Sequence, residues 1–218
     1  LMLSEGKKVL YRPHPRFAKM EIVRDYIPNE CIQDPRSVDI DDSMMELEVL
    51  IKYMLTPSDL LNIIQNFILF ESDGDKTIKI LAAYHQYYMV NKAVKRTSKV
   101  LADPDDKRIG VVWHTTGSGK SLSMVFYSGI VARKLGNPTI LVINDRNDLD
   151  DQLFGTFAAA HEYLQQNPDH AESRGEVRKY MSKNSGGIVF STIQKFSPNF
   201  DAGEEHMPIL TNRSNVIV

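Results

Sequence analysis

The sequence predicts an α/β domain in which helices flank a parallel sheet, preceded by a mostly helical N-terminal segment. From residue 106 onward, short apolar runs of strand length alternate with longer amphipathic stretches of helix length. The apolar runs are continuous and lack the polar and apolar alternation of a half-exposed strand, which is typical of parallel strands buried on both faces. A glycine-rich loop joins the first apolar run to the next helix, as is common in sheets of this kind.

The composition is that of an ordinary globular chain. Of its 218 residues, 42% are hydrophobic and 25% are charged, which excludes a disordered or fibrous protein. The net charge of -2 gives no overall attraction to a polyanion, so nucleic-acid contacts would have to come from local residues. Cys31 is the only cysteine, and no stretch suits a signal peptide or a membrane span. We therefore expect a cytoplasmic protein without a membrane partner.

The chain divides into three predicted segments. Residues 1–45 show neither helical nor strand periodicity, and their structure is left open. Residues 46–105 are predicted to be a helical lead-in, and residues 106–218 to be the α/β domain.

The lead-in is predicted to contain three helices. Apolar residues between positions 45 and 55 recur at intervals of three and four, as on one face of a helix. A second helix begins at "TPSDLL", with Thr56 as its cap and Pro57 in its first turn, and continues through "NIIQNFILF". A third helix is predicted over residues 76–101, after the turn-forming stretch "ESDGD".

The α/β domain is predicted to follow a simple alternation of elements. Its segments, in chain order, are a strand at 109–113, a helix at 120–135, a strand at 139–143, a helix at 148–164, a polar stretch, a strand at 187–191 and a final strand at 215–218.

The stretch "VVWHTTGSGKS", residues 111–121, has the features of a phosphate-binding loop. In such a loop, backbone amides of a glycine-rich turn and the N-terminus of the following helix face phosphate oxygens. A lysine reaches the β- and γ-phosphates, and a serine or threonine hydroxyl binds Mg²⁺. The candidate phosphate-binding residues are Thr116, Gly117, Ser118, Gly119, Lys120 and Ser121, with Ser121 also the metal ligand. The loop therefore predicts ATP and Mg²⁺ as cofactors.

The loop departs from the general pattern GxxxxGK[ST] at one position. The pattern begins with glycine where this chain has His114. The apolar run before the loop and the amphipathic helix after it nevertheless provide the context that the motif requires. The alternative is a flexible Gly-Ser turn with no ligand.

These motifs resemble those of the R (restriction) subunit of type I restriction-modification enzymes, the HsdR type, whose translocase motor belongs to the superfamily 2 helicases. "WHTTGSGKS" is similar to the first motor motif of that family, His114 included. "PTILVINDRNDLDDQL" and "GIVFSTIQKF" are similar to its next two motifs, and the match extends over about residues 46 to 218. The resemblance implies that residues 106–218 form the first RecA-like motor lobe, truncated before the acidic Walker B motif.

The resemblance also implies roles for four residues outside the loop. Gln86 stands where the family contacts adenine, and Asp145, Arg146 and Thr192 stand where it contacts the DNA backbone. Each has an alternative role: Gln86 could be a solvated helix residue, Asp145 and Arg146 could form a local salt bridge, and Thr192 could cap a helix.

The resemblance implies an ATP-hydrolysing type I site-specific deoxyribonuclease that defends its host against foreign DNA. Its expected partners are double-stranded DNA and the methyltransferase and specificity subunits of the complex. The chain would supply the ATP-binding part of the motor and be inactive alone, because it contains no complete catalytic set. Residues 1–45 could derive from the end of the nuclease region. The alternatives are another P-loop phosphotransferase or a non-catalytic assembly fragment.

Overall fold

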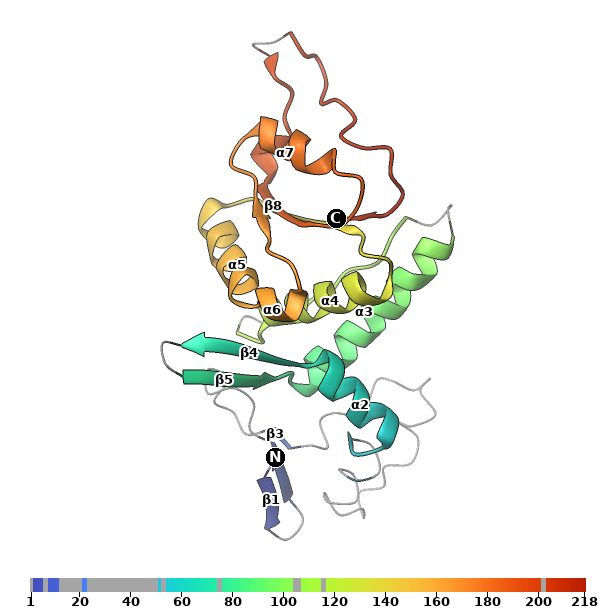
Figure 1. The fold of residues 1–218 in the computed structure, drawn as a ribbon, viewed down its shortest axis with the longest axis vertical. Helices are drawn as coiled ribbons and strands as arrows, with labels where there is room; N and C mark the ends of the chain where they lie inside the picture. The colour runs from blue at the N-terminus through green and yellow to red at the C-terminus, as the bar shows by residue number, and fades with distance from the viewer. Residues whose placement is uncertain are drawn as a thin grey trace. The chain divides into compact units, whose positions relative to one another are not determined.

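The computed structural model describes residues 2–5, 8–11, 21–22, 51, 54–73, 76–103, 107–114, 117–200 and 203–218. The chain forms two compact units (Figure 1). The first unit consists of residues 1–93 and 110–126, and the second consists of residues 94–109 and 127–218.

The first unit begins with a small antiparallel sheet. Its strands are β1 (Met2–Glu5), β2 (Lys8–Tyr11) and β3 (Glu21–Ile22), paired in that order. These strands lie in the segment whose structure the sequence left open. Most of the helix predicted between residues 45 and 55 lies outside the described residues.

Helix α2 (Pro57–Asn66) begins where the sequence predicts. The Thr56 hydroxyl accepts a hydrogen bond from the backbone N–H of Asp59 at 3.4 Å, and Pro57 occupies the first turn. The predicted continuation through "FILF" is wrong, because the helix ends at Asn66.

A β-hairpin replaces the predicted helical residues on both sides of the "ESDGD" stretch. Strand β4 (Ile68–Asp73) pairs antiparallel with β5 (Lys76–Leu81). In β5, Ile80 is buried whereas Thr77 and Lys79 are exposed, the two-residue period of a strand. The β-branched residues of "KTIKIL" also favour a strand over a helix. The third predicted helix is therefore shorter at its start than predicted.

Two helices complete the core of the first unit. They are α3 (Tyr84–Ala102) and α4 (Lys120–Lys134), whose opening segments belong to this unit. Phe67 is fully buried, and its ring centroid lies 4.7 Å from that of Tyr87 and 5.7 Å from that of Phe126. These aromatic contacts join the end of α2 to α3 and α4.

The predicted strand at 109–113 is absent. Residues 107–114 have no strand assignment, and 95% of Val111 and 84% of Trp113 are exposed. A continuous apolar run forms a strand only where a neighbouring strand pairs with it, and none of the described strands does so here.

The second unit contains the predicted parallel sheet. Its strands lie in the order β7-β8-β6-β9, and each neighbouring pair is parallel. Their bounds are β6 (Thr139–Asn144), β7 (Asp169–His170), β8 (Ile188–Thr192) and β9 (Val216–Ile217). The α/β fold class is therefore confirmed. β7 was not predicted, because two residues give no periodic signal.

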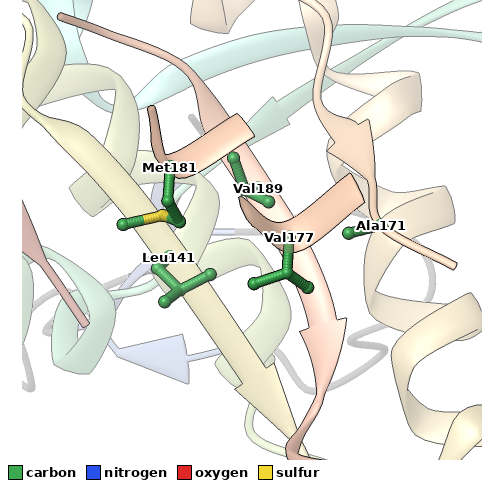
Figure 2. Close-up of a cluster of buried hydrophobic side chains, with 5 residues drawn as sticks. All are labelled: Leu141, Ala171, Val177, Met181 and Val189. Atoms are coloured by element: carbon green, nitrogen blue, oxygen red, sulfur yellow. The ribbon is translucent and has the colours of Figure 1, made fainter. Parts of the chain in front are cut away.

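Helices cover both faces of this sheet. On one face, Val177 and Met181 of α7 (Arg174–Met181) pack with Ala171 and with Leu141 and Val189 of the sheet (Figure 2). On the other face, the Phe157 ring of α5 (Asn147–Ala159) lies 4.9 Å from that of Phe190. Alternate residues of β8 thus point to opposite layers, and all five are buried.

The helical boundaries differ from the prediction in two places. The predicted helix at 148–164 is divided at Ala160 into α5 and the short α6 (His161–Leu164). The polar stretch contains α7, whose start has the spacing of a capping box. Ser173 Oγ accepts from Glu176 N as in that motif, whereas a Glu176 carboxylate oxygen accepts from Glu172 N, one residue before the cap. None of the described helices is long and apolar enough to cross a membrane.

Candidate nucleotide and nucleic-acid sites

The loop before α4 has the backbone geometry of a phosphate cradle. Gly117 and Gly119 have φ values of 83° and 77°, in the left-handed region that strains any residue with a Cβ. The loop leads directly into α4 at Lys120, and the first backbone N–H groups of a helix have no partner within it. The predicted residues Gly117 to Ser121 therefore lie together at a helix N-terminus, where an anion is favoured. Thr116 lies outside the described residues.

The first turn of α3 supports this loop from behind. His85 Nε2 lies 2.8 Å from the carbonyl oxygen of Ser118, and Gln86 Nε2 donates to the carbonyl oxygen of Gly119 at 2.9 Å. Gln86 Oε1 also accepts from the backbone N–H of Ala83 at 2.8 Å, and only 3% of Gln86 is exposed. Gln86 is thus a buried residue that contacts the loop, and the solvated alternative is wrong.

The charged and hydroxyl groups of the loop suit a magnesium nucleotide. Lys120 Nζ donates to the carbonyl oxygen of His114 at 3.2 Å, so the ammonium lies over the loop. Ser121 follows in the first turn of α4, where a hydroxyl ligand of Mg²⁺ is expected. A cation, a hydroxyl and a turn of left-handed glycines fit the chemistry of Mg-ATP.

His114 is in an unusual environment for a histidine. Burial lowers its pKa from the ordinary value of 6.5, and the nearby charges of His85 and Lys120 lower it further. Its Nδ1 is buried and has no hydrogen-bond partner among the described residues. The His114 ring also packs edge-on against the His85 ring, with 5.3 Å between centroids.

We expect acid to destabilise the first unit through His114. Its pKa is lower in the folded chain than in the unfolded chain, so the unfolded chain takes up the proton first as the pH falls below 6.5. Stability contributed by the neutral ring is therefore lost on acidification. Between about pH 7.5 and 5.5, the melting temperature should fall less steeply with decreasing pH in His114→Gln than in the wild type. Parallel pH profiles for the two proteins would contradict this.

The second unit has a pocket at the carboxyl edge of its sheet. It is formed where β6, β7 and β8 end and where α5 and α7 begin. Its lining residues are Asp145, Arg146, Asn147, Asp148, Glu172, Ser173, Arg174, Gly175, Thr192, Gln194 and Lys195. The structure thus brings Asp145 and Arg146 together with Thr192, which is distant from them in the sequence. Ligands commonly bind at this edge of a parallel sheet.

The three predicted residues differ in what they offer a ligand. Arg146 forms a two-point ion pair with Asp148, at 3.0 Å and 2.7 Å, so its local partner is Asp148 and not Asp145. Asp145 is exposed. Thr192 is only 3% exposed and precedes a short 3-10 helix without a capping hydrogen bond from its side chain.

Two cations of this pocket, Arg174 and Lys195, were not predicted from the sequence. Arg174 begins α7, and its Nη2 donates to Ser197 Oγ at 2.9 Å. Lys195 Nζ donates to the carbonyl oxygen of Ala171 at 2.7 Å. The capping-box spacing of "SRGE" could have revealed the start of α7 and hence the position of Arg174.

A hydrogen bond between His170 and the buried Asp150 fixes the same edge of the sheet. His170 Nε2 lies 2.6 Å from an oxygen of Asp150, whose other oxygen accepts from Asn144 Nδ2 at 2.7 Å. Asp150 is 1% exposed, and the Phe154 ring stacks on His170 with 4.8 Å between centroids. These contacts join α5 to β6 and β7, and so hold the loops that form the pocket.

Comparisons with known proteins agree with the geometry. The family model of the SWI2/SNF2 ATPase matches residues 85–218. The chain is 49% identical over 177 residues to the HindI endonuclease subunit of a type I restriction enzyme from Haemophilus influenzae, covering 79% of this chain and 17% of that protein. A Methanocaldococcus jannaschii protein named as the corresponding MjaIXP subunit is 36% identical, covering 79% of this chain and 16% of that protein. The chain thus spans about one sixth of the length of these curated relatives.

Proposed function

This chain belongs to the SWI2/SNF2 ATPase family, and on that premise we propose that it is the ATP-binding part of the DNA-translocating motor of a type I restriction endonuclease R subunit. In the intact enzyme, ATP hydrolysis would drive translocation along double-stranded DNA before cleavage. The intact enzyme would be a type I site-specific deoxyribonuclease that acts in host defence. The motor lobe would be residues 106–218, with residues 46–105 as its lead-in. The methyltransferase and specificity subunits would be its partners in the cytoplasm.

The geometry of the loop before α4, which the first turn of α3 supports, is the observation that carries the ATP-binding half of this proposal. The left-handed Gly117 and Gly119 leave space for phosphate oxygens beside the backbone. Lys120 would turn from the His114 carbonyl to the β- and γ-phosphates, which are the stronger acceptors because they are charged. Ser121 would bind Mg²⁺, which neutralises phosphate charge when it is bound. Adenine contact by Gln86 would require its carboxamide to leave one of its two backbone partners.

The pocket of the second unit supports the DNA half. Its cations are Arg146, Arg174 and Lys195, and its acids are Asp145, Asp148 and Glu172, so the pocket has no net charge. Binding would therefore depend on individually placed donors and not on a general positive field. Arg174 donates to a serine hydroxyl and its charge also acts on the Glu204 carboxylate, whereas Lys195 donates to a carbonyl oxygen. A phosphate would therefore give each cation a charged hydrogen-bond acceptor that the described hydrogen bonds do not supply. Contacts of this kind recognise the backbone and not the base sequence.

We expect Arg174→Ala to weaken duplex DNA binding for all sequences alike. Loss of one phosphate contact should make the plot of log affinity against log salt concentration shallower, with a slope smaller in magnitude by about 1. Fluorescence anisotropy with two unrelated duplexes, from about 50 to 200 mM salt, measures both effects. Lys179→Ala is the matched control, because Lys179 is an exposed cation on the same helix and outside the pocket.

Two results would contradict the DNA half. One is an equal loss of affinity in the Lys179 and Arg174 variants, which would indicate general charge attraction. The other is a loss confined to one of the two duplexes, which would indicate base recognition. Calorimetric titration of the chain with Mg-ATP tests the nucleotide half, and a folded chain that binds none would contradict it.

A further inference from the structure

We propose that His85 is a positioning residue of the phosphate loop: its imidazole fixes the direction of the Gly119 backbone N–H toward the bound phosphates. The inference rests on the proposed function, because it concerns how the same loop holds a nucleotide. The carbonyl oxygen of Ser118 can only accept a hydrogen bond, so the His85 ring carries its proton on Nε2 and donates it at 2.8 Å.

The geometry of the peptide unit turns this contact into a direction for the next amide. In a trans peptide, the C=O of one residue and the N–H of the next point to opposite sides, and the described residues contain no cis peptide. Because His85 holds the Ser118 C=O toward α3, the Gly119 N–H points away from α3. Gln86 holds the Gly119 C=O toward α3, so the Lys120 N–H points the same way. Two successive amides are thereby aligned for one phosphate group.

Such a contact matters because of the glycines in the loop. Gly117 and Gly119 have left-handed φ values, and glycine has the widest choice of backbone conformations. A loop that samples many conformations must lose that freedom when it binds a ligand, which weakens binding. His85 and Gln86 are neighbours in the first turn of α3, so they offer two donors from one helix. The edge-on contact with the His114 ring helps to hold the His85 ring in place.

The Gly119 carbonyl oxygen has further donors besides Gln86. It accepts from Gln86 and also from the backbone N–H of Ser123 at 3.0 Å and its hydroxyl at 3.2 Å. The first turn of α4 therefore helps to orient the peptide that follows Gly119. The peptide between Ser118 and Gly119 is the one that His85 contacts, so a change at His85 tests the direction of the Gly119 N–H.

The test compares variants of the full 218-residue chain by calorimetry, with magnesium tripolyphosphate as the probe. Tripolyphosphate carries the phosphates of ATP without adenine, so it reports on the loop alone. His85→Phe keeps the volume of the ring but removes the donor, and should lower affinity about threefold to tenfold, the effect of one hydrogen bond. His85→Gln places an amide nitrogen as far along the side chain as Nε2, and should restore affinity to within about twofold of the wild type.

The possible outcomes separate this inference from the proposed function. Tripolyphosphate binding that is weakened threefold to tenfold in His85→Phe and restored in His85→Gln supports the inference. Equal affinities of the wild type and His85→Phe overturn it and leave the nucleotide site standing. Equal losses in His85→Phe and His85→Gln, with a lower melting temperature in both, indicate a packing role and also overturn it. A folded wild type that binds neither tripolyphosphate nor Mg-ATP overturns both proposals.

Discussion

Replacing Lys120 with alanine is expected to lower the affinity of the chain for Mg-ATP by about tenfold to a hundredfold, the effect of losing a hydrogen bond between two charged groups. Lys120 is the first residue of α4, and its ammonium already lies over the loop, bonded to the His114 carbonyl. A bound triphosphate would bring several negative charges to this point, and alanine leaves them without that cation. The backbone amides of the loop remain, so a weaker affinity should persist.

Calorimetry with Mg-ATP measures this change, and Lys134→Ala is the control. Lys134 is an exposed lysine in the last turn of α4, so its removal changes the net charge by the same amount. Circular dichroism would verify that both variants keep the fold of the wild type. Equal affinities of the Lys120 and Lys134 variants would mean that the loop does not hold the phosphates of ATP, and the nucleotide half of the proposed function would be wrong.

The phosphate loop was predictable because its residues are contiguous. Gly117 to Ser121 carry both the left-handed backbone and the functional groups, and the next helix follows at once. The contacts that support the loop were not predictable from spacing. His85 and Gln86 precede their loop partners by 33 residues, and only the folded chain brings the two segments together. The resemblance drew attention to Gln86 as an adenine contact, a role that stays a proposal.

The fold was predictable where a segment had one clear period. β6 and β8 are continuous apolar runs, and both are parallel strands of the sheet as predicted. The hairpin of β4 and β5 was missed because its short strands directly adjoin helices. One residue separates α2 from β4 and two residues separate β5 from α3, so no turn-forming stretch marks either boundary. The strand predicted at 109–113 does not form. A strand needs a paired neighbour, and the sequence pattern alone does not show whether one is present.

The pocket at the carboxyl edge of the sheet shows the same limit. Asp145, Arg146 and Thr192 were assigned by resemblance, and the topology of parallel strands explains why they meet at one edge. Arg174 lies outside the motifs that carry the resemblance. Lys195 lies within one of these motifs, at a position that the resemblance did not single out. Their place in the pocket depends on where α7 begins and on how β8 passes into the next turn. Some residues of the pocket could therefore be predicted from the local sequence, whereas the others could be identified only from the fold.

Replacing Phe190 with alanine is expected to lower the free energy of unfolding by about 3–5 kcal/mol, the usual cost of removing a buried aromatic ring. Phe190 is fully buried in the middle of β8, and its ring lies 4.9 Å from that of Phe157 and 5.6 Å from that of Phe154. The alanine variant would leave a cavity between the sheet and α5. Because Phe154 also stacks on His170, the cavity should loosen the hydrogen bond between His170 and Asp150 as well.

Urea unfolding of the second unit measures this loss, with Phe200→Ala as the control. Phe200 is 71% exposed, so the same substitution there should change the free energy of unfolding by less than about 0.5 kcal/mol. β8 ends at Thr192 and is followed closely by Lys195, so Phe190→Ala should also weaken the proposed duplex DNA binding at temperatures where the unit begins to unfold. Equal stabilities of the Phe190 and Phe200 variants would mean that the packing of α5 on this sheet contributes little, and that the edge with the proposed DNA site is held by other contacts.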